Sequence, residues 1–461
     1  MSTGRGSQPH SAALPLLSRS EAHEVFAWRH GRPVRVGEFL ADVARVAEAM
    51  PAGAHVLNVC QDRYHVAVGF AAAMLRGKLS LLPPTRTEDM LRRLREQAPD
   101  LFCLVDGPCE LALPQMPYPR SAPAAAAASR ALPWIPADQV VARVYTSGST
   151  GAALPHDKTW GALVACIRAG ASRLGLPPAA TLVATVPAQH MYGLESSLLM
   201  ALHGGVALSA AHPFYPADIV EQLARVPAPR VPVSTPVHLR ALLAAGLELP
   251  ALCLVLSATA PLDAELAHAV EQRTGAALLE IYGSTETGQI ATRRTTQGQE
   301  FTLLDGVELL PQPEGFAMAR GGHLAAPTPV HDIIETVGAG RFRLHGRSAD
   351  MVNVAGKRGS LAHLNHQLCA IPGVLDGVFF APEHDCADGV ARLMAFAVAP
   401  GLDATVLRAA LRERIDPAFM PRPLVLLERL PRNSTGKLAR ARLAELAGAH
   451  VPFPQADDDG P

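Results

Sequence analysis

Aromatic residues make up only 5% of this 461-residue chain, and charged residues only 18%, below the usual quarter for a globular protein. The charges also balance, because 41 Lys and Arg stand against 42 Asp and Glu, which leaves a formal net charge of −1. Nucleic-acid binders usually carry a basic face and often aromatic side chains for base stacking, so this composition argues against such a partner. Hydrophobic residues reach 49%, which indicates a large buried core.

Cysteine motifs and long apolar runs are also lacking. The 7 cysteines are an odd number, are scattered and never form a CxxC pair, so neither a disulfide framework nor a zinc ribbon is expected. No apolar run reaches the ~18 residues that a membrane span needs. The first residues have no sustained apolar stretch behind a basic start, which is not the pattern of a signal peptide. We therefore expect a cytoplasmic protein without a membrane span.

Short apolar runs alternate with helical patterns over most of the chain, which predicts an α/β fold of parallel sheets covered by helices. The expected strands are 54–59, 79–82, 101–105, 140–145, 181–186, 230–234, 252–256 and 277–282, with helices at 64–76 and 87–97. A smaller α+β unit follows, with a hairpin at 342–354, helices at 361–368 and 404–414, strands at 374–380, 392–398 and 424–427, and a last helix from Gly436. We expect a large N-terminal domain at 1–347 and a small C-terminal domain at 348–461, disordered from about 452.

The most distinctive segment is Thr-Ser-Gly-Ser-Thr-Gly at 146–151, which follows a predicted strand and precedes a helical pattern from Thr159. Glycines let the backbone approach a ligand closely, and hydroxyl and N–H groups donate hydrogen bonds, so the segment suits a polyanion such as a triphosphate. Each bond to a charged oxygen contributes about 1.5–3 kcal/mol. The segment is not a Walker loop, which would need Gly at Ala153. A flexible Ser/Gly turn is the alternative for this segment taken alone.

A second loop, Tyr-Gly-Ser-Thr-Glu at 282–286, also follows a predicted strand. A carboxylate beside hydroxyls suits Mg²⁺, which binds few protein ligands and takes phosphate oxygens as well. Tyr282 could lie flat on a base, although an ordinary turn with a solvated Glu286 is the alternative. Gly-Arg at 346–347 and Leu-Pro-Arg at 430–432 followed by Gly436-Lys437 are further motifs. If Gly436 opens a helix, Lys437 can aim one ammonium at a shared site; otherwise it is a surface lysine.

The order and spacing of these motifs resemble the AMP-forming adenylating superfamily of acyl- and aryl-CoA ligases, peptide-synthetase adenylation domains and luciferases. The resemblance covers residues 40–445, and it includes Pro-Ala-Gln-His-Met-Tyr-Gly at 187–193, Ser-Ala-Thr-Ala-Pro-Leu at 257–262 and Asp332 before Gly346-Arg347. It implies that the protein activates a carboxylic acid with ATP to an acyl-adenylate. The acyl group would then pass to a phosphopantetheine thiol of CoA or of an acyl carrier protein. The small C-terminal domain would be mobile and would rotate between the two half-reactions.

The resemblance also implies roles for single residues. Lys437 would stabilise the charge that develops between the carboxylate and the α-phosphate, Thr285 would contact that phosphate, and Glu286 would bind Mg²⁺. Asp332 would accept hydrogen bonds from both ribose hydroxyls, and Arg347 would add a second contact nearby. The remaining ATP site would comprise Thr146, Ser147, Gly148, Ser149, Thr150, Gly151, Tyr282 and Gly283.

The acid and the thiol have their own implied residues. The acid pocket would be formed by His190, Tyr192, Gly193, Ser257, Ala258 and Thr259. Gly356 and Lys357 would line the tunnel for the pantetheine arm, and Gly356 would leave room for it. Ala349 occupies the hinge position.

The chain departs from the family pattern at two positions. Leu154 stands where the family usually has a lysine after the phosphate loop, with Lys158 four residues later, which puts phosphate neutralisation from this side in doubt. Ala349 stands where the hinge usually has Asp or Lys, so rotation would be less well controlled.

A narrower resemblance concerns the substrate. The stretches at 58–64, 189–195 and 352–358 resemble the ligases of aryl-polyene, xanthomonadin-type pigment clusters, which would imply a hydroxybenzoate-like acid. A medium-chain fatty acyl-CoA ligase is the alternative. A nucleotide-binding relative that has lost thioester ligation is another, and a purely structural or interaction protein would not need these nucleotide motifs.

Overall fold

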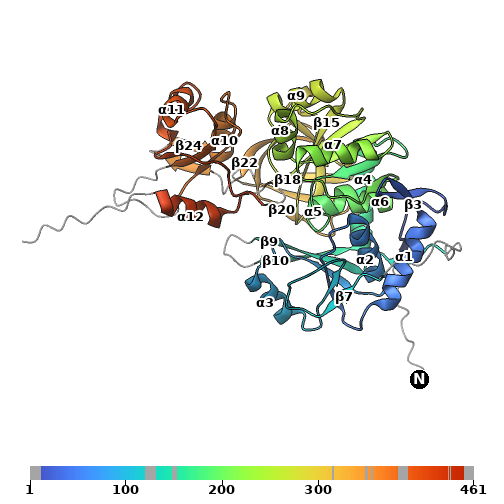
Figure 1. Ribbon diagram of the computed structural model, residues 1–461. Helices are drawn as coiled ribbons and strands as arrows, with labels where there is room; N and C mark the ends of the chain where they lie inside the picture. Colours follow the sequence, from blue (N-terminus) through green and yellow to red (C-terminus); the bar gives the residue numbers. More distant parts are fainter. Residues whose placement is uncertain are drawn as a thin grey trace, which may run out of the picture.

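The computed structural model describes residues 12–119, 131–147, 153–313, 316–347, 351–354, 357–382, 393–433, 436 and 438–450 (Figure 1). Over these ranges, two large sheets with helices against them form most of the molecule, and further small sheets lie towards the C-terminus. None of the described helices has the length and apolar character needed to cross a bilayer. The predicted α/β fold is confirmed.

Within the described ranges the larger sheet has 11 strands, and its centre is parallel. From edge to edge it contains β21 (Asp332–Thr336), β22 (Arg341–Arg347), β17 (Glu300–Leu303), β16 (Gly288–Arg293), β15 (Ala277–Ser284), β14 (Leu254–Ser257), β13 (Arg230–Ser234), β11 (Thr181–Ala184), β12 (Ala207–Ser209), β2 (Val25–Arg29) and β3 (Arg32–Arg35). The helices near it are α4 (Trp160–Leu174), α7 (Pro216–Arg225), α8 (Pro236–Ala244) and α9 (Ala264–Thr274). The central strands are continuous apolar runs because both of their faces are buried.

The second sheet follows the order β10 (Ala153–Thr159), β9 (Val140–Ser147), β5 (Leu79–Leu82), β4 (His55–Asn58), β6 (Phe102–Val105) and β7 (Gln115–Pro117). Helices α1 (Val36–Ala49), α2 (Arg63–Leu75) and α3 (Glu88–Gln97) belong to this part of the chain. Asp62 starts α2, because its carboxylate accepts hydrogen bonds from the N–H groups of Tyr64 and His65. The antiparallel pair β9 and β10 ends at the segment 148–152, which lies outside the described residues.

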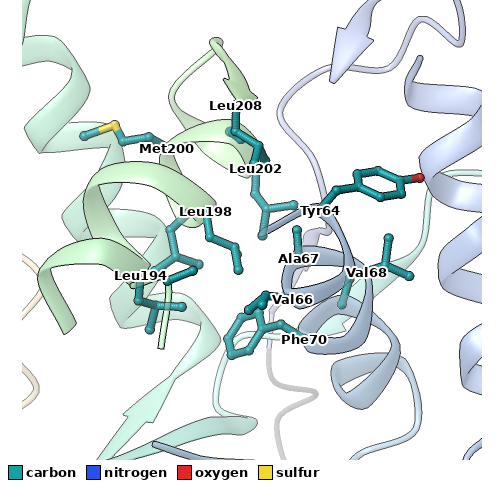
Figure 2. Packing of buried hydrophobic residues seen from close by; sticks show 14 of the residues in the cluster. Tyr64, Val66, Ala67, Val68, Phe70, Leu194, Leu198, Met200, Leu202 and Leu208 are labelled. Atoms are coloured by element: carbon teal, nitrogen blue, oxygen red, sulfur yellow. The ribbon is translucent and has the colours of Figure 1, made fainter. Parts of the chain in front are cut away.

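The two sheets share one hydrophobic core. Helix α2 is apolar almost all round and packs beside a continuous helical run made of α5 (Met191–Gly193), the π-helix η2 (Leu194–Leu199) and α6 (Met200–His203). Figure 2 shows Leu194 and Leu198 of this run next to Val66 and Phe70 of α2. This packing fixes the distance between the carboxyl ends of strands in the two sheets.

The C-terminal part contains a hairpin, a small sheet and the helices α10 (Leu361–Cys369), α11 (Ala404–Arg412) and α12 (Arg440–His450). The hairpin is β23 (Met351–Val354) with β24 (Lys357–Ser360), and the sheet is β25 (Asp376–Phe380), β26 (Met394–Val398) and β27 (Leu424–Leu426). Its buried side chains form clusters of their own. The smaller elements elsewhere are β1 (Ala13–Pro15) with β8 (Trp134–Pro136), and the sheet β18 (Val307–Pro311), β19 (Ala317–Gly321) and β20 (Thr328–Val330).

Two sequence-based predictions were wrong here. The predicted hairpin at 342–354 is divided, because β22 pairs with β17 and β21 of the large sheet while β23 pairs with β24. The last helix does not open at Gly436. That glycine has φ +77 and lies in a turn closed by an antiparallel bridge between Arg432 and Leu438, so α12 begins only at Arg440.

Candidate active site

A cavity of about 1990 Å³ lies among the carboxyl ends of strands from both large sheets and residues of the C-terminal part that include Arg432, Asn433, Gly436, Leu438 and Ala439. Open parallel sheets bind their ligands at this end. Of the predicted site residues, the lining contains Thr146, His190, Thr259, Tyr282, Gly283, Thr285, Glu286 and Asp332. The fold thus brings segments that are distant in the sequence to one hollow.

Other predicted residues can be placed only in part. Ser147, Arg347 and Lys357 lie in β9, β22 and β24. The predictions for Gly148, Ser149, Thr150, Gly151, Ala349, Gly356 and Lys437 lie outside the described residues. The neighbours of Lys437 are described, and both Gly436 and Leu438 line the cavity.

The loop between β15 and β16 presents Thr285 and Glu286 to the cavity. Its turn is closed on both sides, because the Ser284 N–H donates to Thr287 Oγ1 at 3.1 Å and the Thr287 N–H donates to Ser284 Oγ at 3.2 Å. Burial alone would raise the pKa of Glu286. Hydrogen bonds from its own backbone N–H and from Ser284, together with nearby histidines, lower that pKa overall, so the carboxylate is an anion near neutral pH.

The β9–β10 hairpin borders this loop. Thr146 pairs in register with Leu154, whose side chain is 54% exposed. His156, two residues on along β10, lies 3.1 Å from Thr146 Oγ1 and 3.8 Å from the Glu286 carboxylate. Burial lowers the pKa of His156, so the imidazole is neutral at pH 7 and can donate a hydrogen bond to one oxygen only.

Three residues predicted for the ATP site, Tyr282, Asp332 and Arg347, lie near one another at the edge of the large sheet. Asp332 of β21 pairs in register with Arg347 of β22. The Tyr282 hydroxyl donates to Asp332 Oδ2 at 2.6 Å, and its ring packs 5.4 Å from both Phe301 and Phe342. These two aromatic contacts hold the Tyr282 ring beside Asp332 at the wall of the cavity.

The predicted acid-side residues divide into two layers. His190 lines the cavity and starts α5 by accepting the Tyr192 N–H at its Nδ1, and Thr259 lines it with φ +79, in the left-handed region. Tyr192 and Ser257 are buried behind this wall. A Cβ on Gly193 would lie 1.9 Å from the Pro187 carbonyl oxygen, so the glycine allows α5 to pack closely there. Ala258 is likewise buried.

Sequence reasoning missed Arg63. This fully buried arginine lines the cavity and donates to the carbonyls of Ala184 and Val186 at 2.9 and 2.7 Å and to Ser197 Oγ at 3.0 Å. It therefore joins α2 to β11 and η2. A charged residue at the start of an otherwise apolar helix was the available signal.

The C-terminal segment approaches α8. A Cβ on Gly436 would lie 3.5 Å from Thr235 Oγ1 and from Val237 Cγ2. Arg432 holds the segment in shape, because its guanidinium pairs with both carboxylate oxygens of Asp376 at 2.6 Å and donates to the Gly436 carbonyl at 2.8 Å.

Comparison with known proteins gives a family match. Residues 49–308 match the family model described as AMP-binding enzyme. A 4-coumarate–CoA ligase of Rhodobacter capsulatus is 31% identical over 240 residues, which are 50% of this chain and 57% of that protein. A 4-coumarate–CoA ligase of Halorhodospira halophila is 30% identical over 315 residues, or 64% of this chain and 73% of that one.

Solved structures share the fold across nearly the whole chain. The o-succinylbenzoate coenzyme A synthetase of Bacillus subtilis, in complex with ATP and a magnesium ion, superimposes with a TM-score of 0.76 at 19% identity. The match covers 91% of this chain and 96% of that one. At this identity the likeness concerns the α/β fold.

Proposed function

The chain belongs to the AMP-binding enzyme family, and from this premise we propose that it is an ATP-dependent, AMP-forming acid–thiol ligase. The observation that carries the proposal is the cavity, where Thr285, Glu286 and Asp332 face the segment next to Lys437. Hydroxyls, one carboxylate for a metal and one for a ribose are the groups that an ATP site needs. The domain boundary near residue 347 and the mobility of the C-terminal part belong to the same proposal.

In the first half-reaction, a carboxylate oxygen of the acid attacks the α-phosphorus of ATP, and pyrophosphate leaves. Thr285 contacts the α-phosphate, and the segment 146–151 holds the β- and γ-phosphates. Lys437 stabilises the negative charge that concentrates between the two reactants. Asp332 accepts the ribose hydroxyls, with Arg347 opposite it in register.

Glu286 is a suitable magnesium ligand. Its pKa is lowered, so it is anionic, and its carboxylate is only partly buried at the cavity wall. No group of three or more His, Cys, Asp or Glu suited to a metal occurs among the described residues. That fits Mg²⁺, which takes one or two carboxylates and completes its shell with phosphate oxygens and water. When bound, the ion neutralises the triphosphate.

In the second half-reaction, a phosphopantetheine thiol attacks the acyl carbonyl, and AMP leaves. Gly356 and Lys357 would border the path of the thiol after the C-terminal part has turned about Ala349. CoA is supported as the acceptor by the 4-coumarate–CoA ligase relatives. An acyl carrier protein is the alternative acceptor.

The free cysteines of the described residues support a reducing, cytoplasmic location.

We infer that the acid is aromatic and hydroxylated, like a hydroxybenzoate. The relatives that act on 4-coumarate support an aryl acid. Around the acid side, the lining includes Gln189, His190, His212 and Thr259, and such polar groups favour a substrate that can hydrogen-bond over an alkyl chain. The narrower assignment to ligases of aryl-polyene pigment clusters rests on the sequence stretches alone.

The test is ATP–pyrophosphate exchange with a panel of aryl and alkyl acids, followed by thioester formation with CoA and with a carrier protein. We expect exchange with hydroxylated aryl acids and a thioester with CoA. Exchange with alkyl acids alone would instead indicate a medium-chain acyl-CoA ligase. Exchange without any thioester would indicate a relative that has lost ligation, and the absence of exchange with every acid would refute adenylation.

The variant Lys437→Ala tests the mechanism. Loss of one preorganised donor to a developing charge should slow exchange by about 10²–10³. Arg442→Ala is the matched control, because Arg442 is 65% exposed on α12 and pairs with Glu445 of the same helix. Undiminished exchange by the Lys437 variant would refute the role of this lysine.

A further inference from the structure

The back of the Thr285–Glu286 loop is held by side chains from three separate elements. Lys158 Nζ of β10 donates to the Glu286 carbonyl oxygen at 2.8 Å. His323, between β19 and β20, donates from Nε2 to the Thr287 carbonyl oxygen at 2.8 Å. Glu195 of the π-helix η2 accepts the Gln289 N–H at 3.2 Å. Each contact fixes a backbone group of the loop and leaves its cavity side open.

Glu195 is unusual for its position. It is 4% exposed, and its other carboxylate oxygen lies 3.4 Å from the Cys166 thiol. Burial raises the pKa of Glu195 to about 7, while Lys158, Cys166 and the Gln289 N–H oppose that rise. A buried carboxyl without such partners would cost several kcal/mol, and the three partners of Glu195 reduce that cost.

Gly288 shows how closely Glu195 and His323 pack against the backbone of the loop. It has φ +70, and a Cβ at this position would lie 2.6 Å from Glu195 Oε1 and 3.6 Å from His323 Nε2. Only glycine gives the loop its left-handed turn and at the same time lets the carboxylate reach the next N–H. π-Helical turns occur often at functional sites, and here the wider turn carries Glu195.

Lys158 also bears on the departure at Leu154. The exposed Leu154 provides no positive charge next to the phosphate segment. Four residues later, the Lys158 ammonium lies behind the neighbouring loop, where it interacts electrostatically with Glu195, Cys166 and Glu286. Lys158 therefore bonds the backbone of the metal-ligand loop rather than standing next to the phosphate segment.

We propose that Lys158, Glu195 and His323 are positioning residues that hold the backbone of residues 286–289, so that Thr285 and Glu286 meet Mg²⁺ and phosphate in a preformed arrangement. The inference rests on the proposed function, since it assigns the supports of the proposed metal ligand. None of the three is among the residues that line the cavity. Because these residues hold the loop in place before ATP binds, ATP binding does not have to include the entropic cost of ordering the loop.

The experiment measures ATP binding to the full-length protein by titration calorimetry, with Mg²⁺ and with EDTA. Lys158→Met keeps the length of the side chain and removes the ammonium. Because a hydrogen bond from a charged donor contributes about 1.5–3 kcal/mol, we expect ATP affinity with Mg²⁺ to fall about 10- to 100-fold. Affinity in EDTA should fall by clearly less, because the contact between Glu286 and Mg²⁺ is then absent from both proteins.

Two variants sharpen the test. Asp157→Asn is the matched control, because the neighbouring Asp157 is 43% exposed and pairs with Arg143 within the hairpin; its affinities should be those of the parent. His323→Phe keeps a planar ring and removes the donor to the Thr287 carbonyl, so it tests a second of the three contacts if Lys158→Met does not fold. In a Glu286→Gln background, Lys158→Met should have little further effect on the Mg²⁺-dependent part.

The outcomes separate this inference from the proposed function. If the parent protein binds ATP with no dependence on Mg²⁺, the assignment of Glu286 fails. If the parent depends on Mg²⁺ but Lys158→Met and His323→Phe both retain that dependence, the positioning role is overturned and the ligase proposal stands. An equal loss of affinity with Mg²⁺ and with EDTA would also overturn it, because a general structural defect predicts that result.

Discussion

Replacing Arg293 by methionine should destabilise the protein strongly. Arg293 of β16 lies directly opposite Glu280 of β15 in the antiparallel pair, and its Nε donates to the carboxylate at 2.6 Å. Glu280 is 6% exposed and also accepts hydrogen bonds from Thr295 Oγ1 at 3.2 Å and from the Leu262 N–H at 3.3 Å. Burial raises the pKa of Glu280, and Arg293 is the main group that opposes this rise.

The magnitude follows from the partner that is left behind. Removing one member of a buried ion pair costs about 3–5 kcal/mol, because the other member stays buried without compensation. Thr295 and Leu262 would still bond Glu280, and methionine would still pack on the Phe301 ring, over which the guanidinium lies at 4.4 Å. We therefore expect the lower end of that range, about 3 kcal/mol.

The assay is urea unfolding followed by linear extrapolation of the free energy. The matched control is Arg320→Met, because Arg320 pairs with Glu308 across β18 and β19 in the same cross-strand geometry, with both side chains at least half exposed. Such a surface pair contributes about 0–1 kcal/mol. The double variant Glu280→Met/Arg293→Met should recover most of the loss. If Arg293→Met lost no more stability than Arg320→Met, the reasoning about the buried pair would be refuted.

Two further predictions concern stability. Burial lowers the pKa of His203 to about 4. Below pH 6.5 the unfolded chain therefore binds more protons than the folded protein, so the free energy of unfolding should fall as the pH drops from 6.5 towards 4. The expected loss between pH 7 and pH 5 is on the order of 2 kcal/mol. His203→Gln, measured by unfolding across this range, should flatten the dependence, whereas the exposed His268→Gln should not; equal slopes would count against burial as the cause. Gly193→Ala should lower the melting temperature, because its Cβ would lie 1.9 Å from the Pro187 carbonyl oxygen, while Gly448→Ala, with open space around it in α12, should raise stability by about 0.5–1 kcal/mol. A tolerated Gly193→Ala would mean that α5 can shift.

Much of the fold could be predicted from sequence, because buried parallel strands are continuous apolar runs. The bounds 79–82 and 230–234 agree with β5 and β13 for this reason. The pairing partners of strands could not be predicted in this way, since a hydrophobic pattern indicates a strand without indicating which other strand it pairs with. The chain around β22 was therefore assigned to a local hairpin, although its partners β17 and β21 lie in the large sheet.

The candidate site shows the same division. Hydroxyl- and glycine-rich loops after strands predicted Thr285 and Glu286 for the site, because such motifs are local in the sequence, and both residues line the cavity. The supports Glu195, His323 and Arg63 were not found, since a carboxyl, an imidazole or a guanidinium acquires its partners only when distant elements pack together. A charged residue within an apolar segment is the general signal for such supports, and both Arg63 and Glu195 carry it.

The Arg432–Asp376 pair has a consequence for turnover. Because the pair joins Arg432 to the first residue of β25, and Arg432 also donates to the Gly436 carbonyl, these residues would move together with the small sheet if the C-terminal part rotates as proposed. Any turn of that sheet away from α8 would remove Gly436 and Leu438 from the wall in the same movement. If the C-terminal part turns between the half-reactions, as proposed, that turn opens this wall of the cavity after adenylation, so pyrophosphate can leave without a separate gate.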